Sequence, residues 1–343
     1  MGNATTLNAR RKMILVGLIA MAGVLFPGHA DVAQAQGLHG GHSGHASSGE
    51  LELRGTIVHG FALAASALLA GLAPFAALVW LPASSEVGAG YRAVRPFGLA
   101  AWGLFYVLVF AGVGELASYA ARASGEPLDP ALFKEALLET RVGAVWIARI
   151  GFALITASAI IAAVRWGRAW LWWTAAGAGG LLLMTLTQIS HAAAEGRFLP
   201  FLADWVHATA AAIWMGGLLG LVLASFSGPM GELEGDQKAR LRERSVRRFS
   251  TIAITAVLVL GSTGLYAALL HVPSWEALVS TPYGRALLTK LGLLALVLAI
   301  GAVNLLLRGR GPLGGLVVLE LLLASGLFVA TGFLTTLPPA SAS

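Results

Sequence analysis

The sequence has no cysteine and few charged side chains. Of its 343 residues, 12% are charged and 57% are hydrophobic. A chain without thiols forms no disulfide, no thiolate metal site and no iron–sulfur cluster. Soluble domains carry about 25% charged residues, so a chain with half that share is poorly suited to a surface that faces water. The composition therefore predicts a membrane protein.

Several motifs of soluble enzymes are also missing. The sequence has no glycine-rich phosphate loop followed by Lys-Ser or Lys-Thr, which argues against ATP-driven pumping. It has neither a His-Glu-x-x-His zinc motif nor a serine nucleophile elbow. We therefore expect a protein that is not an enzyme. The net charge of +6 does not indicate a nucleic-acid partner, because the basic residues lie mostly in short loops between apolar runs.

Residues 1–35 have the layout of a bacterial export signal. Arg10, Arg11 and Lys12 precede an apolar stretch over residues 13–26, and Ala33-Gln34-Ala35 forms a small-x-small cleavage site. The apolar stretch is shorter than the roughly 20 residues that a transmembrane helix needs. We expect this signal peptide to be cleaved, which places the mature N-terminus in the periplasm. An uncleaved anchor is the alternative.

A Gly-, Ser- and His-rich segment over residues 36–54 follows, and we expect it to be a disordered periplasmic tail. The rest of the chain is a series of apolar segments, each about long enough to cross a hydrocarbon core of roughly 30 Å as a helix. The predicted fold is an all-α polytopic bundle in the lipid bilayer, with two four-helix halves, 55–200 and 201–339. The eight predicted spans are 57–81, 97–120, 143–164, 169–190, 203–227, 250–270, 286–307 and 312–335.

The basic residues predict the orientation of the spans. With both mature termini in the periplasm, the inner loops hold twice as many Lys and Arg residues as the outer ones, as the positive-inside rule requires of a bacterial inner-membrane protein. The inner set is Arg92, Arg95, Arg165, Arg168, Lys238, Arg240, Arg242, Arg244, Arg247, Arg248, Arg308 and Arg310. The outer set is Arg54, Arg122, Lys134, Arg141, Arg197 and Arg285.

The two halves carry similar motifs in the same order. The segment 92–97, Arg-Ala-Val-Arg-Pro-Phe, resembles the segment 244–249, Arg-Ser-Val-Arg-Arg-Phe, and each precedes the second span of its half. Four pairs match at one constant offset: Thr140 and Thr281, Gly143 and Gly284, Arg149 and Lys290, Gly151 and Gly292. Val58-His59 also matches Val206-His207 at the start of spans one and five. We infer a parallel internal repeat related by an axis along the membrane normal.

Four histidines are predicted to lie near the ends of spans, all at the outer face: His59, His207, His191 and His271. Imidazole binds copper, zinc and haem iron, and ionisable residues in a bilayer are often functional. The repeat relates His59 to His207, so these two are candidates to face each other across the interface between the halves. The alternative for each histidine is a structural, hydrogen-bonded role.

Other residues near His207 are candidates to support a metal site. Asp204 lies one turn before His207, where a carboxylate can orient the imidazole, although it can equally be a solvated residue at the helix start. Trp214 shares a helix face with His207. Met215 offers a thioether suited to Cu(I), with ordinary core packing as the alternative.

Arg149 and Lys290 are predicted to lie at equal depth in spans three and seven. Each is placed either to snorkel outward or to neutralise a carboxylate or anionic group near the histidines. Glu115 in span two is a candidate partner, and a structural ion pair is the alternative.

The tail repeats a histidine at every third residue, namely His39, His42 and His45, between glycines and serines. Such a flexible tract is able to wrap a cupric or zinc ion. A solubilising linker is the alternative.

A set of residues in the C-terminal half has the order and spacing of a known family. These residues are His207, Ala211, Trp214, Gly216, Gly217, Arg247, Phe249, Thr263, Gly264, Thr281, Tyr283, Gly284, Arg285, Lys290, Gly301 and Asn304. In them the chain resembles the CopD family of bacterial copper-resistance membrane proteins, whereas the first half is similar to the family only in the layout of its spans. The resemblance implies an inner-membrane protein that handles copper between periplasm and cytoplasm, usually by import, beside a separate periplasmic carrier of the CopC type. It implies a functional role for His207, and for His59 only through the repeat.

Two other functions remain open from the residues alone. A b-type cytochrome would use histidines on facing helices as the two ligands of haem b. A copper sensor or assembly factor would bind the metal without transporting it. Haem content separates the first alternative from a copper permease, and a flux assay separates the second.

Overall fold

The computed structural model describes residues 47–88, 94–124, 129–188, 198–226, 235–306 and 313–336. Within these ranges the regular elements are all helices, which confirms the predicted all-α class. The helices are α3 (Ser47–Phe75), the π-helical segment η2 (Ala76–Trp80), α4 (Leu81–Glu86), α5 (Arg95–Ser124), α6 (Pro130–Leu138), α7 (Arg141–Trp166), α8 (Ala169–Thr187), α10 (Phe198–Phe226), α12 (Gly235–His271), α13 (Trp275–Ser280), α14 (Pro282–Leu306) and α15 (Leu313–Thr336).

Among the described residues, seven helices are long and apolar enough to span a membrane. They correspond to the first seven predicted spans. The eighth prediction falls on α15, where the apolar stretch Val318–Gly332 counts as a shorter helix. The protein is therefore a multi-pass membrane protein. The expected signal peptide, residues 1–35, lies outside the described residues.

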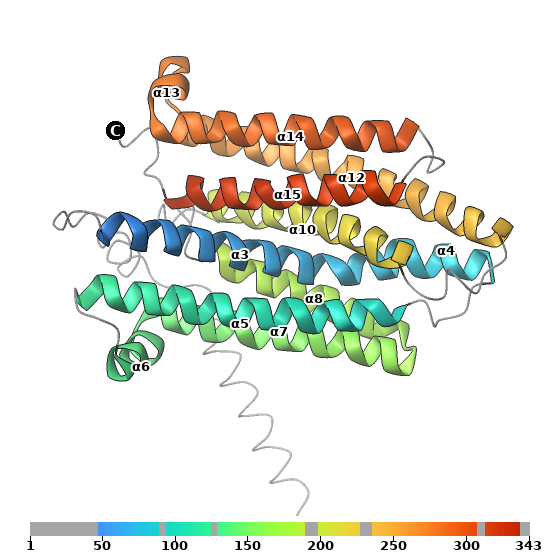
Figure 1. The fold of residues 1–343 in the computed structure, drawn as a ribbon, viewed down its shortest axis with the longest axis horizontal. Helices are drawn as coiled ribbons and strands as arrows, with labels where there is room; N and C mark the ends of the chain where they lie inside the picture. Colours follow the sequence, from blue (N-terminus) through green and yellow to red (C-terminus); the bar gives the residue numbers. More distant parts are fainter. Residues whose placement is uncertain are drawn as a thin grey trace, which may run out of the picture.

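Helix α3 is at the centre of the bundle. It packs against α5 and α8 of its own half and against α10 and α15 of the other half. In Figure 1, α5, α7 and α8 lie on one side of the α3–α10 pair, and α12, α14 and α15 lie on the other. The two halves therefore meet along their first helices, which are also the helices that carry His59 and His207.

The contact between α3 and α10 depends on two glycines. A Cβ atom on Gly71 would overlap the carbonyl oxygen of Ala212, and one on Gly216 would overlap the backbone of Gly71. Small residues let membrane helices approach this closely, where backbone packing replaces the hydrophobic effect as the source of association. Gly216 and Gly71 therefore allow α3 and α10 to pack closely.

The two halves also share a turn with the same hydrogen bonds. Thr140 caps α7 by accepting from the Gly143 N–H at 3.1 Å, and Thr281 accepts from the Gly284 N–H at 3.0 Å. Each threonine hydroxyl also donates to a carbonyl four residues earlier, at the end of a short helix. The short helices are α6 and α13, which lie at the same end of the bundle (Figure 1). We call this end the outer end.

At the opposite end of the bundle, which we call the inner end, ion pairs join the two halves. Glu86, the last residue of α4, forms ion pairs with Arg244 and Arg248 of α12. Helix α12 has 37 residues, which corresponds to about 55 Å at 1.5 Å per residue. It therefore extends well beyond a hydrocarbon core of about 30 Å. Its first turns, which are rich in Lys and Arg, lie at the inner end.

We predict that Gly216→Ala lowers the thermal denaturation midpoint of the detergent-purified protein. The added methyl group overlaps the Gly71 backbone, and overpacking of this kind costs about 1–3 kcal/mol. Gly177→Ala in α8 is the matched control, because no atom lies within 4 Å of the position its Cβ would take. Equal midpoints for the two variants would contradict the α3–α10 contact.

Candidate metal-binding site

The histidines described by the structure lie toward the outer end. His59 is in the first half of α3, His207 is the tenth residue of α10, and His271 is the last residue of α12. Helices α3 and α10 begin at this end and α12 ends there (Figure 1). His191, His39, His42 and His45 lie outside the described residues, so their roles stay predictions.

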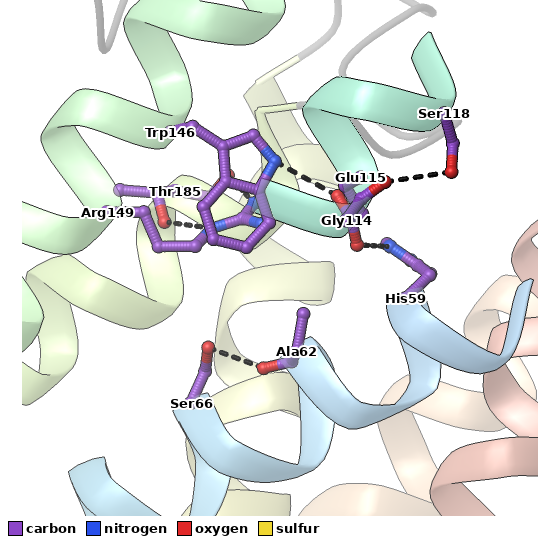
Figure 2. Close-up of polar contacts among 9 residues, drawn as sticks. All are labelled: His59, Ala62, Ser66, Gly114, Glu115, Ser118, Trp146, Arg149 and Thr185. Carbon is purple, nitrogen blue, oxygen red and sulfur yellow. Dashed lines mark hydrogen bonds and ion pairs between the residues drawn. The ribbon is translucent and has the colours of Figure 1, made fainter. Parts of the chain in front are cut away.

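His59 is held by a carboxylate of the neighbouring helix. Its Nδ1 lies 2.7 Å from Oε1 of Glu115 on α5, and Oε2 of the same carboxylate accepts from the Trp146 indole N–H at 3.0 Å (Figure 2). A carboxylate that accepts at both oxygens assigns the imidazole hydrogen to Nδ1. The Nε2 lone pair of His59 is then the one available to a metal ion, in the manner of carboxylate–histidine–metal sites.

Arg149 supplies the positive charge next to this carboxylate. The side chain is fully buried, and it donates to Thr185 of α8 through Nε to Oγ1 and through Nη2 to the carbonyl, both at 3.1 Å. Its guanidinium carbon lies 4.3 Å from the centroid of the Trp146 ring. Trp146 thus contacts Arg149 with its face and Glu115 with its N–H, and the two charges attract each other beside it (Figure 2). Arg149 and Glu115, which were predicted as partners, interact electrostatically. Trp146 contacts both, Glu115 by a hydrogen bond and Arg149 by a cation–π contact.

His207 is held in the same way by a neutral partner. Its Nδ1 lies 2.9 Å from Oγ1 of Thr263 on α12. The Thr263 hydroxyl already donates to the Val259 carbonyl at 2.7 Å, so its oxygen is the acceptor and Nδ1 carries the hydrogen. The Leu260 carbonyl of α12 also interacts with this ring, and a metal ion on His207 would bind at Nε2.

The two arrangements occupy equivalent places in the two halves. Each histidine bonds to a residue 56 positions later in the chain, Glu115 in one half and Thr263 in the other. Lys290 of α14, the counterpart of Arg149, interacts electrostatically with His207 and with Asp204. Asp204 was a candidate to orient the His207 ring, but at Nδ1 Thr263 has this role.

The three described histidines do not gather into one cluster. His59 and His207 bond to different helices, so neither ring is directed by its hydrogen bond toward the interface between the halves. His271 donates from Nδ1 to the Ala267 carbonyl of its own helix at 2.8 Å and stacks on Tyr283. Within the described ranges no three His, Asp or Glu side chains are close enough to hold one ion. The geometry therefore offers separate single-imidazole positions.

The remaining candidates of α10 are packing residues in this structure. Trp214 and Met215 have exposed fractions of 3% and 1% and belong to the main apolar core. The alternative weighed for Met215, ordinary core packing, is the one observed.

Sequence reasoning missed three residues of the site: Trp146, Thr185 and Thr263. The shared separation of 56 residues was a signal for Thr263, because it links a polar residue of span six to the same position as Glu115 in span two. Sequence reasoning also missed Glu320, the only acidic residue of the last span, which is 5% exposed.

An all-helical bundle whose helices are apolar and long enough to cross a bilayer defines a polytopic membrane protein. A family model described as copper resistance protein D matches residues 243–334, and one described as the copper resistance protein D-like N-terminal domain matches residues 52–200. The chain belongs to the copper resistance protein D family. The family match thus includes the first half, in which only the layout of the spans resembled the family.

The chain is also similar to the copper transport protein CutJ of Bacillus subtilis (strain 168). The identity is 34% over 190 residues, which cover 54% of this chain and 34% of that protein. The chain thus spans about a third of the length of this curated relative. No solved structure matches the chain significantly.

We predict that Glu115→Gln lowers the thermal denaturation midpoint because it leaves the fully buried Arg149 without its counter-charge. Removal of one partner of a buried pair costs about 3–5 kcal/mol, whereas replacement of both by neutral groups is often nearly neutral. The Glu115→Gln/Arg149→Met double variant should therefore recover most of the loss. Losses that simply add in the double variant would show that the two charges do not interact.

Proposed function

We propose that this protein mediates copper transport across the bacterial inner membrane, with uptake from periplasm to cytoplasm, and so contributes to copper homeostasis and resistance. The observation that carries the proposal is that His59 and His207, at equivalent positions of the two halves, are each held by a hydrogen bond at Nδ1, which makes Nε2 the nitrogen that a metal ion would bind. Family membership and similarity to a protein called a copper transport protein support copper as the cargo. The proposal assigns the protein no catalytic reaction.

In this proposal His207 is the principal copper contact. Thr263 is neutral and fixes the ring without adding charge, whereas the His59 ring is tied to a carboxylate that is itself balanced by Arg149. His59, His191 and His271 act as further outer contacts for the ion. The imidazoles of His39, His42 and His45 capture copper ahead of them, from a separate CopC-like carrier.

The proposed orientation follows from charge. The basic turns at the start of α12 and its ion pairs with Glu86 are at the inner end, and Lys and Arg face the cytoplasm in inner-membrane proteins. The histidine-bearing end is then periplasmic, together with both mature termini.

The haem alternative is less well supported. Ligation of haem b by two histidines needs two imidazoles directed at one iron. The rings of His59 and His207 are turned by their hydrogen bonds toward α5 and α12, which lie on opposite sides of the α3–α10 pair (Figure 1). Purified protein with iron and a haem spectrum, and without copper, would overturn the copper proposal.

We predict that Thr263→Val weakens copper binding about 10- to 100-fold, which is the usual effect of losing a hydrogen-bond partner of a ligating histidine. The measurement is a competition titration of the purified full chain carrying His39→Ala, His42→Ala and His45→Ala, so that the tail does not contribute. In this background His207→Ala should lower the bound copper by about one ion per chain.

Thr209→Val is the matched control for Thr263→Val. Its hydroxyl bonds only within α10, to the Trp205 carbonyl at 2.8 Å, so the copper affinity should stay at the parent value. An equal loss of affinity in both threonine variants, or full copper retention in His207→Ala, would contradict the role of His207.

A further inference from the structure

The C-terminal half contains a buried acidic residue that the outer site does not use. Glu320 of α15 is 5% exposed. A Cβ atom on Gly301 of α14 would lie 3.1 Å from its Oε1, so the carboxylate rests against the bare backbone of α14. An ionisable residue within a membrane span is costly and is retained mainly where it has a function.

Glu320 is at a different depth from the histidines. It is the eighth residue of α15, which begins at Leu313, so it lies about 10 Å along the helix from that end. Its neighbour Gly301 is 11 residues beyond Lys290 on α14, which is about 16 Å along the axis. Lys290 in turn is the electrostatic neighbour of His207. The carboxylate is thus roughly three helical turns inward of the outer site.

Glu320 and the outer site also share one face of α14. Eleven residues are close to three full turns, so Lys290 and Gly301 lie on the same side of the helix. Val297, between them on this side, is fully buried. One face of α14 therefore runs from the outer site, at His207 and Lys290, to the inner carboxylate of Glu320. The buried Val297 lies between the two.

The described part of the N-terminal half has no counterpart of this arrangement. Counted from the capping threonines, Gly301 corresponds to Ile160, which is fully buried, and α8 contains no acidic residue. In the N-terminal half, the ring of Trp146 on α7 packs directly against Gly112 of α5. The equivalent helices α12 and α14 touch each other far less than α5 and α7 do. An inner carboxylate and a loosely packed helix pair thus occur together in the C-terminal half.

We infer that Glu320 is a cation-binding carboxylate at which copper, after leaving His207, stops in the inner half of the membrane. The inference rests on the proposed transport function and adds the inner contact that the outer histidines lack. A carboxylate oxygen offers a negative charge to the ion where water is excluded, so the ion is partly neutralised during the crossing. The missing side chain of Gly301 lets the carboxylate pack this close to α14, because a Cβ atom there would lie 3.1 Å from Oε1.

The test uses the full chain in proteoliposomes with external copper, supplied as Cu(I) under ascorbate and, separately, as Cu(II). Glu320→Gln keeps the size of the side chain and removes its charge. The inference predicts that copper flux falls at least tenfold while the copper bound at the outer site, measured in the purified protein, stays at the parent level. Glu320→Asp should give an intermediate flux, because its carboxylate is one methylene further from Gly301.

Ser325→Ala is the matched control, since it removes a polar group from the same helix that bonds only to the Leu321 carbonyl. Gly301→Ala is a second probe that keeps the carboxylate and crowds Oε1, and it should also lower the flux. Flux in Glu320→Gln equal to that of the parent would overturn the role of Glu320, with the transport function intact. A parent protein that moves no copper would overturn the proposed transport and this inference together.

Discussion

The backbone contact between α3 and α10 is the constraint on which the rest of the structure depends. Gly71 and Gly216 allow the two helices to touch without side chains between them, and the remaining helices pack around this pair. Because both helices carry a histidine toward the outer end, the contact also sets the depth of the two imidazoles. Helices α5 and α12 lie on opposite sides of the pair, and they supply the hydrogen-bond partners of His59 and His207.

The internal repeat places similar residues at similar depths but does not make the two halves equivalent. In the N-terminal half, His59, Glu115, Trp146 and Arg149 form a continuous, partly buried network in which the charges are balanced. In the C-terminal half, a neutral threonine holds His207, and Lys290 lies nearby with Asp204. A tightly packed half with a closed polar network suits a scaffold, whereas the more open half carries the residues proposed to contact the cargo.

The positions of the spans could be predicted from sequence because a bilayer allows few alternatives. A helix of about 20 apolar residues satisfies its own backbone, so hydropathy alone located seven helices and the region of α15. The capping turns were also foreseeable, since Thr140 and Thr281 match in spacing and form the same bonds.

The partners of the histidines could not be predicted, because they depend on how each helix rotates about its axis. Asp204, one turn away on the same helix, was the reasonable candidate for His207, whereas the bond at Nδ1 is to Thr263 of another helix. Apolar sequences carry little information about rotation, and close contacts such as that of Gly71 with Gly216 decide it. Glu320 is a different case, because a single acid in an apolar span was visible in the sequence.

The most direct test of the central claim is X-ray absorption at the copper edge on the copper-loaded full chain with His39→Ala, His42→Ala and His45→Ala. If His207 binds copper, the first shell around the copper contains nitrogen, and the outer shells show the scattering of an imidazole ring. His207→Ala should lose that scattering. A first shell of sulfur from methionine, or an imidazole signal unchanged in His207→Ala, would contradict it.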